Sequence, residues 1–62
     1  MKYLKTINGW KIEQTKHGDL RITNIKDRDL FTWCNYSNGQ FDSEYLIPDI
    51  IKIWCRKWLN VK

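Results

Sequence analysis

Three side chains in this sequence have the chemistry of a nucleophile or a soft metal ligand: His17, Cys34 and Cys55. A nucleophilic thiol needs a general base beside it, but His17 is predicted in a hairpin turn, away from both cysteines. A structural zinc site takes four ligands, which one histidine and two cysteines cannot supply. We therefore expect neither thiol catalysis nor bound zinc, and we interpret the cysteines as small apolar residues in or beside the core.

The acidic residues offer no clearer catalytic arrangement. Asp27 and Asp29 form a carboxylate pair, but Lys26 and Arg28 alternate with them in one short polar stretch. Such a stretch is typical of a solvated turn. The sequence also has no glycine-rich phosphate loop and no cluster of metal ligands. We therefore expect a protein that is not an enzyme and that uses no cofactor and no metal.

The length of the chain, 62 residues, predicts one small domain spanning residues 1–62. A domain of this size buries only about 60% of its unfolded surface, so a partner chain would add useful stability. The N-terminal residues contain no apolar run of the kind found in a signal peptide. No stretch approaches the roughly 20 apolar residues of a membrane span. We therefore expect a cytoplasmic protein without a membrane partner.

The first structural unit is a predicted hairpin made of residues 10–14 and 20–24. Apolar and polar residues alternate in both runs, which is the pattern of half-buried strands. Placing Ile12 opposite Ile22 puts both on one face and leaves Lys16, His17 and Gly18 as the loop. A three-residue hairpin loop needs a positive φ at its end, and Gly18 adopts one at little cost.

Residues 30–36 form the third predicted strand, which the polar turn of residues 26–29 joins to the second. Closing this turn with Ile25 opposite Leu30 would place Trp33 opposite Ile22. The inner face would then contain Trp10, Ile12, Leu20, Ile22, Phe31 and Trp33. The outer face would contain Lys11, Glu13, Arg21, Thr23, Ile25, Leu30, Thr32, Cys34 and Tyr36.

The chain is predicted to end in a helix that begins at Pro48, because proline is favoured in the first helical turn. An earlier start at Asp42 or Ser43, both good caps, would place Pro48 inside the helix at a cost of about 3 kcal/mol. Five apolar residues recur at helical spacing and form one stripe along the helix, which would pack against the sheet. The stripe consists of Ile47, Ile51, Trp54, Trp58 and Val61.

These elements predict an α+β fold: a three-stranded antiparallel sheet of order 1-2-3, with one C-terminal helix packed on its inner face. The topology is β-β-β-α. Cys34 would lie on the outer side of the sheet and Cys55 on the inner side. Since a disulfide needs Cα atoms within about 7 Å, we expect these cysteines to remain unbonded.

Two binding functions from different classes are compatible with this fold, and protein binding is the favoured one. The aromatic and branched residues exceed what one sheet face and one helix stripe can bury, and protein interfaces are enriched in aromatic side chains and Arg. Eight Lys, eight Ile, five Asn and no Ala indicate an AT-rich gene, as in low-GC bacteria and their phages. We therefore expect a binding module, either a phage or mobile-element inhibitor of a host enzyme or defence complex or a self-associating dimer. The residues expected to bind the partner are Tyr36, Tyr45, Ile53, Arg56 and Lys57.

The alternative is a small basic nucleic-acid-binding domain. The formal net charge is +4 and the isoelectric point about 9.3, which would attract phosphates. The outer sheet face and a basic edge of the helix would make the contacts. The residues expected to bind nucleic acid are Lys11, Arg21, Thr23, Thr32 and Lys52.

Overall fold

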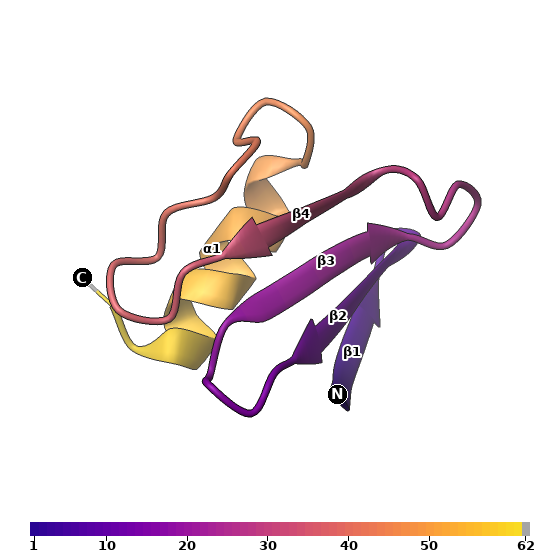
Figure 1. Cartoon of the computed structure of the whole chain (residues 1–62). Helices are drawn as coiled ribbons and strands as arrows, with labels where there is room; N and C mark the ends of the chain where they lie inside the picture. Colours follow the sequence, from indigo (N-terminus) through magenta and orange to yellow (C-terminus); the bar gives the residue numbers. More distant parts are fainter. Residues whose placement is uncertain (62) are drawn as a thin grey trace.

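The computed structural model describes residues 1–61, which form four strands and one helix. The strands are β1 (Lys2–Ile7), β2 (Trp10–Gln14), β3 (Leu20–Asn24) and β4 (Phe31–Cys34), and the helix is α1 (Asp49–Leu59). The strands form one antiparallel sheet in the order β1-β2-β3-β4, and α1 lies against one of its faces (Figure 1). The predicted α+β class, antiparallel sheet and C-terminal helix are confirmed, but the sheet has four strands instead of three. No helix within residues 1–61 has the length and apolar character needed to cross a membrane.

The strand missing from the prediction is β1. A two-residue turn joins it to β2, with Asn8 at φ 47° and Gly9 at φ 83°, and Ile7 pairs with Trp10. Two positive φ values are the geometry of a type I′ hairpin turn, for which Asn-Gly is the preferred sequence. A register shift between Tyr3 and Lys5 interrupts the pairing, so the apolar residues of β1 do not alternate regularly along the strand.

The hairpin of β2 and β3 has the predicted register, with Ile12 opposite Ile22 and Trp10 opposite Asn24. The Thr15 N–H donates to the Asp19 carbonyl at 2.9 Å and closes the three-residue loop. Gly18 has a φ of 104°, as its place at the end of that loop requires. The side chains of Ile12, Leu20 and Ile22 are fully buried.

The register of β4 differs from the prediction by one residue, and this correction changes the surface of the protein. The observed pairs are Leu20 with Cys34, Arg21 with Trp33, Ile22 with Thr32 and Thr23 with Phe31. A shift of one residue moves every side chain of a strand to the opposite face. Thr32 and Cys34 therefore point into the core, whereas Phe31 and Trp33 lie on the outer face, contrary to expectation.

Asn24 explains the shift. Its side-chain oxygen Oδ1 accepts hydrogen bonds from the N–H groups of Lys26 (2.9 Å) and Asp27 (3.1 Å). Its own N–H donates to the Leu30 carbonyl at 2.9 Å. Asn side chains commonly stabilise turns in this way. The loop consequently spans the five residues 25–29, one more than the four-residue turn that the sequence analysis assumed.

Helix α1 begins directly after Pro48, in agreement with the later of the two predicted starts. Its buried residues are Ile51 and Cys55, which join the apolar inner face of the sheet in one core. Trp54 is only partly buried, and Trp58 is 48% exposed, so the assignment of Trp58 to the core was wrong. The centre of the buried helix face therefore differs from the prediction: it consists of Ile51 and Cys55, while Trp54 packs against the edge of the core and the Trp58 Nε1 donates to the Gln14 Oε1 of β2 at 3.4 Å.

Candidate functional site

The outer face of the sheet brings cationic and aromatic side chains together. One row across the strands consists of Lys11, Thr23 and Phe31, because Lys11 pairs with Thr23 and Thr23 with Phe31. The adjacent row consists of Glu13, Arg21 and Trp33, paired in the same way. We call these six residues the outer-face cluster.

Arg21 is the central side chain of the outer-face cluster. Its guanidinium carbon lies 4.8 Å from the ring centroid of Phe31 and 5.7 Å from that of Trp33. A guanidinium at this distance is attracted to the negative face of an aromatic ring. The Nε atom of Arg21 is buried but has no hydrogen-bond partner among the described residues. The arginine therefore covers two rings while one of its donors remains unused.

A hollow of about 380 Å³ lies beside this cluster. Three cationic side chains border it, from Lys11, Arg21 and Arg28, together with one carboxylate, from Glu13. The Lys11 Nζ lies 3.8 Å from the Glu13 Oε1, so the carboxylate offsets part of the positive charge. Thr23, Asn24 and Ile25 complete the lining. The volume falls within the range of small-ligand sites, and the polar lining suits an anionic ligand that also carries hydrogen-bonding groups.

The structure brings together three of the five residues expected to contact nucleic acid. Lys11, Arg21 and Thr23 border the same hollow. Thr32 does not, because it is 2% exposed on the inner side, where its Oγ1 accepts a hydrogen bond from the Ser43 N–H at 3.0 Å. Its placement on the outer face was wrong. Lys52 lies on α1, with its Nζ 3.6 Å from the Asp49 Oδ1.

Sequence reasoning missed three residues of this surface: Phe31, Trp33 and Arg28. The first two were assigned to the core because the turn before β4 was taken to be one residue too short. The polar stretch that starts at Asn24 contains the signal for the longer turn, since Asn is a favoured turn-initiating residue. Arg28 was set aside as part of a solvated turn, and it does lie in an exposed turn, at the rim of the hollow.

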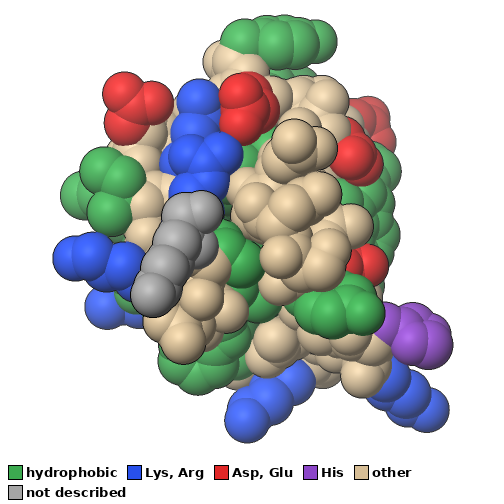
Figure 2. Space-filling model, turned by 90° about the vertical axis from the view of Figure 1, so that its left-hand side faces the viewer, with side chains coloured by type: hydrophobic (Ala, Val, Ile, Leu, Met, Phe, Trp, Pro, Cys, Tyr) green, Lys and Arg blue, Asp and Glu red, His purple; other side chains and the backbone are tan. Residues whose placement is uncertain are grey.

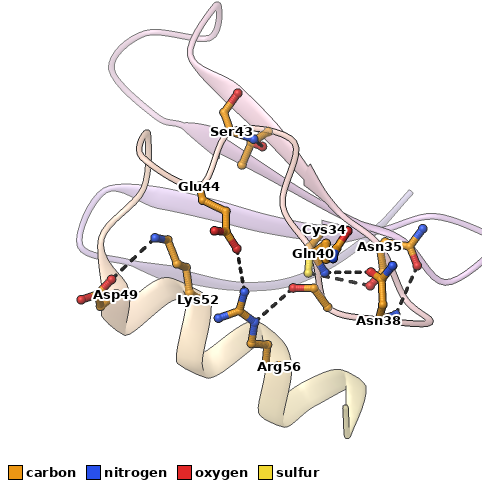
Figure 3. A network of polar contacts seen from close by, with 11 residues as sticks. Cys34, Asn35, Asn38, Gln40, Ser43, Glu44, Asp49, Lys52 and Arg56 are labelled. Atoms are coloured by element: carbon orange, nitrogen blue, oxygen red, sulfur yellow. Dashed lines mark hydrogen bonds and ion pairs between the residues drawn. The ribbon is translucent and has the colours of Figure 1, made fainter. Parts of the chain in front are cut away.

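The residues expected to contact a protein partner do not form one surface. Arg56 is used within the fold: its Nε donates to the Gly39 carbonyl at 3.1 Å and its Nη2 to the Glu44 Oε1 at 2.9 Å (Figure 3). It also lies 5.3 Å from the ring centroid of Phe41. These contacts hold the segment between β4 and α1 against the helix. Tyr36 lies near Gly18 at the β2–β3 loop, and Tyr45 is 92% exposed in the segment before α1.

Ile53 and Lys57, the remaining two of that set, lie on an exposed flank of α1 that is largely apolar. Ile50, Trp54 and Trp58 follow one another at intervals of four residues on the same flank. The indoles of Trp54 and Trp58 are stacked, with ring centroids 5.5 Å apart and an interplanar angle of 9°. Ile50 and Ile53 are 53% and 55% exposed. We call Ile50, Ile53, Trp54 and Trp58 the helix flank.

Charge on the helical side of the molecule is mixed. Figure 2 views the molecule from the side where the segment after β4 and the C-terminal end of the chain lie; Lys and Arg side chains project from several separate edges of this view, with acidic side chains next to the uppermost of them. Within α1, Lys52 and Arg56 are both paired with carboxylates. A phosphate backbone is bound by several cations on one surface, so this side offers less to a nucleic acid than the outer face does.

The residues with nucleophilic or metal-binding chemistry lie apart from these surfaces. Cys34 and Cys55 are fully buried free thiols. Burial raises the pKa of the Cys34 thiol from 9.0 to about 11 and that of the Cys55 thiol to about 12. Neither thiol is therefore activated as a nucleophile. Within residues 1–61, no group of three or more His, Cys, Asp or Glu side chains is positioned to bind one metal ion.

Comparison of the chain with protein-family models, with curated proteins and with solved structures found no match. The function is therefore inferred from the geometry and charge of the two surfaces described above.

Proposed function

We propose that this protein is a small nucleic-acid-binding domain that acts through the outer face of its sheet. The observation that carries the proposal is the register of β4, which sets Phe31 and Trp33 beside Arg21 and Lys11 on one solvent-facing surface. The sequence favoured protein binding because its aromatic and branched residues exceed what the predicted core can bury, and it placed these two aromatics inside that core. Their observed position adds the aromatic component to the face that the nucleic-acid hypothesis uses.

The chemistry of the outer-face cluster matches the two parts of a nucleotide. Aromatic rings and guanidinium planes stack on bases, and Phe31, Trp33 and Arg21 provide such groups. Lys11 and Arg28 lie at the hollow next to them and provide positive charge for phosphates. The net charge of +4 also favours encounter with a polyanion.

Affinity for short oligonucleotides should fall steeply as salt is raised. If Lys11, Arg21 and Arg28 each neutralise one phosphate, binding should weaken by roughly 20- to 40-fold between ~50 and ~200 mM salt, because the released counterions oppose association. The measurement is fluorescence anisotropy with labelled oligonucleotides. The double variant Lys11→Gln/Arg28→Gln should weaken binding and reduce the slope of log affinity against log salt by about 1.4–1.8.

The control variant, Lys16→Gln/Lys57→Gln, removes the same charge from the β2–β3 loop and from α1. It should leave the salt slope within error of the unmodified protein. Equal effects of the two double variants would contradict binding at the outer face. Lack of binding to every oligonucleotide at low salt would contradict the proposed function itself.

We propose protein binding through the helix flank as the second candidate function, with a second copy of this chain as the partner that the surface fits best. Two exposed isoleucines and a half-exposed indole are an unusual concentration of apolar area for a small domain. Asp49, Ile53 and Lys57 lie in one line at intervals of four residues. In an antiparallel helix pair with a two-fold axis at Ile53, Asp49 of each copy would meet Lys57 of the other. The phage-inhibitor hypothesis would place a host enzyme or defence complex on this same flank.

The charge pattern gives the dimer a specific test by sedimentation equilibrium over micromolar to millimolar concentrations. Lys57→Asp should lower the affinity of the dimer several-fold, because the Asp49 carboxylate of each copy would then face another carboxylate at position 57 of the other copy. The double variant Asp49→Lys/Lys57→Asp should restore the dimer affinity, because opposite charges would again face each other with their positions swapped. A monomer at every concentration, or a double variant no better than Lys57→Asp, would contradict the two-fold arrangement.

A further inference from the structure

The rings of Phe31 and Trp33 are placed to accept unpaired bases. They lie two residues apart on β4, which separates them by about 7 Å along the strand. This is about twice the 3.4 Å that separates successive nucleotides along one strand of a duplex. Each ring can therefore hold one base if the bases are spread apart, which a paired and stacked duplex does not allow.

The hollow next to the rings supplies polar groups for the rest of the strand. Glu13 offers a carboxylate that can accept a hydrogen bond from a base amino group, and Thr23 offers a hydroxyl. Lys11 and Arg28 contribute positive charge at the same hollow. A single strand that crosses from β4 toward β2 would thus meet stacking groups first and phosphate-binding groups next.

Arg21 lies over the two rings and would have to move for bases to stack on them. Its Nε is buried and without a hydrogen-bond partner among residues 1–61. A phosphate at the rim would give the guanidinium strong, charge-assisted hydrogen bonds. The contacts with Phe31 and Trp33 that Arg21 loses would be replaced by base stacking on the same rings. The unsatisfied Nε donor therefore favours a rearrangement on ligand binding, in which the guanidinium moves to a phosphate and a base takes its place on the rings.

We propose that the outer face binds single-stranded nucleic acid, with bases stacked on Phe31 and Trp33 and with Arg21 released from these rings to a phosphate. The inference rests on the nucleic-acid function proposed above and specifies the class of strand. It applies to DNA and RNA alike, because base faces and phosphates are common to both.

The test compares one short sequence as single-stranded DNA, single-stranded RNA and duplex DNA, using anisotropy at low salt. Both single strands should bind at least tenfold more tightly than the duplex. Phe31→Leu and Trp33→Leu keep an apolar side chain but remove the aromatic ring. Each should lower single-strand affinity by about tenfold, within the range found when a base-stacking aromatic is removed, and should change duplex affinity little.

Two further variants separate the role of Arg21 from general effects. Arg21→Gln should reduce the salt slope for single strands by about 0.7, the contribution of one phosphate contact. Tyr45→Leu, at a 92% exposed position in the segment before α1, is the matched aromatic control and should leave binding unchanged. Circular dichroism establishes that each variant is folded, and perturbation of the Phe31 and Trp33 ring resonances by an added single strand gives a second measure that needs no variant.

The outcomes distinguish the two proposals. Equal affinity for single strand and duplex, with no effect of Phe31→Leu or Trp33→Leu, would overturn the single-strand inference and leave nucleic-acid binding in place. Binding to none of the three oligonucleotides would overturn both. Binding to only one of the two single strands, with loss on removal of the rings, would support stacking and show that the sugar also contributes.

Discussion

Replacing Ile51 with Ala should lower the free energy of unfolding by about 2–5 kcal/mol, the cost of removing a buried isoleucine from a packed core. The Ile51 side chain is fully buried and belongs to the core that joins α1 to the sheet. At roughly 0.05–0.15 kcal/mol per residue, a domain of this length has a total stability of only about 3–9 kcal/mol. Ile51→Ala should therefore remove a large part of the stability, and denaturant titration followed by circular dichroism measures the loss.

Ile50→Ala is the matched control, because it makes the same chemical change one residue earlier in the same helix. Ile50 is 53% exposed on the helix flank, and substitutions at exposed positions usually change stability by less than about 0.5 kcal/mol. A difference of at least about 1.5 kcal/mol between the two variants is therefore expected. Comparable losses would contradict the orientation of α1 on the sheet.

The central hairpin was predictable from sequence because two independent local signals agree. Alternating apolar residues require Ile12 and Ile22 to share a face, and the resulting loop ends at a glycine that can adopt a positive φ. The start of α1 was predictable for a similar reason, since Pro48 is favoured at the beginning of a helix and costly inside one. Both elements depend on interactions between residues that are close in the sequence.

The edge strand β1 was missed because its irregular pairing removes the alternation that identifies a strand. The register shift between Tyr3 and Lys5 breaks the period of two, and most of the strand is exposed. The turn signal was nevertheless present, since Asn8-Gly9 stands directly before the first predicted strand. Such a pair beside a strand is a strong reason to expect a hairpin partner, even without a regular apolar pattern.

The register of β4 had the largest functional consequence. Apolar and polar residues alternate along this strand, so either register gives a regular face, and the larger Phe31 and Trp33 were assigned to the core. The side-chain hydrogen bonds of Asn24 favour the longer turn and place Thr32 and Cys34 inside instead. A difference of one loop residue therefore converts two core aromatics into the outer-face cluster.

The orientation of α1 was not determined by hydrophobicity alone. Trp54 and Trp58 have more apolar surface than Cys55, yet Cys55 is fully buried and Trp58 is 48% exposed. Part of the reason is Arg56, whose contacts with Gly39, Glu44 and Phe41 fix one side of the helix against the segment that follows β4. These contacts join residues at least twelve positions apart in the chain, and a periodic pattern in the helix sequence contains no information about them.

Stability should fall as the pH rises above about 9, and the two buried thiols should be the cause. Their pKa values are raised by burial to about 11 for Cys34 and about 12 for Cys55, from an ordinary value of 9.0. Because the folded pKa is the higher one, the unfolded chain releases these protons first, and unfolding is favoured increasingly as the pH rises from the unfolded value toward the folded value. Each thiol should cost about 1.4 kcal/mol per pH unit in that interval. At about pH 10 the two together should therefore remove roughly 3 kcal/mol.

The measurement is the free energy of unfolding between about pH 8 and pH 10 under reducing conditions, for the unmodified protein and for Cys34→Ala/Cys55→Ala. The double variant should be less stable at every pH because it leaves small cavities. Over this interval, however, its free energy of unfolding should fall by roughly 3 kcal/mol less than that of the unmodified protein. Each single variant should remove about half of the difference, which keeps the test available if the double variant does not fold. Parallel declines in all four proteins would show that the thiols are not shielded from water as the structure indicates.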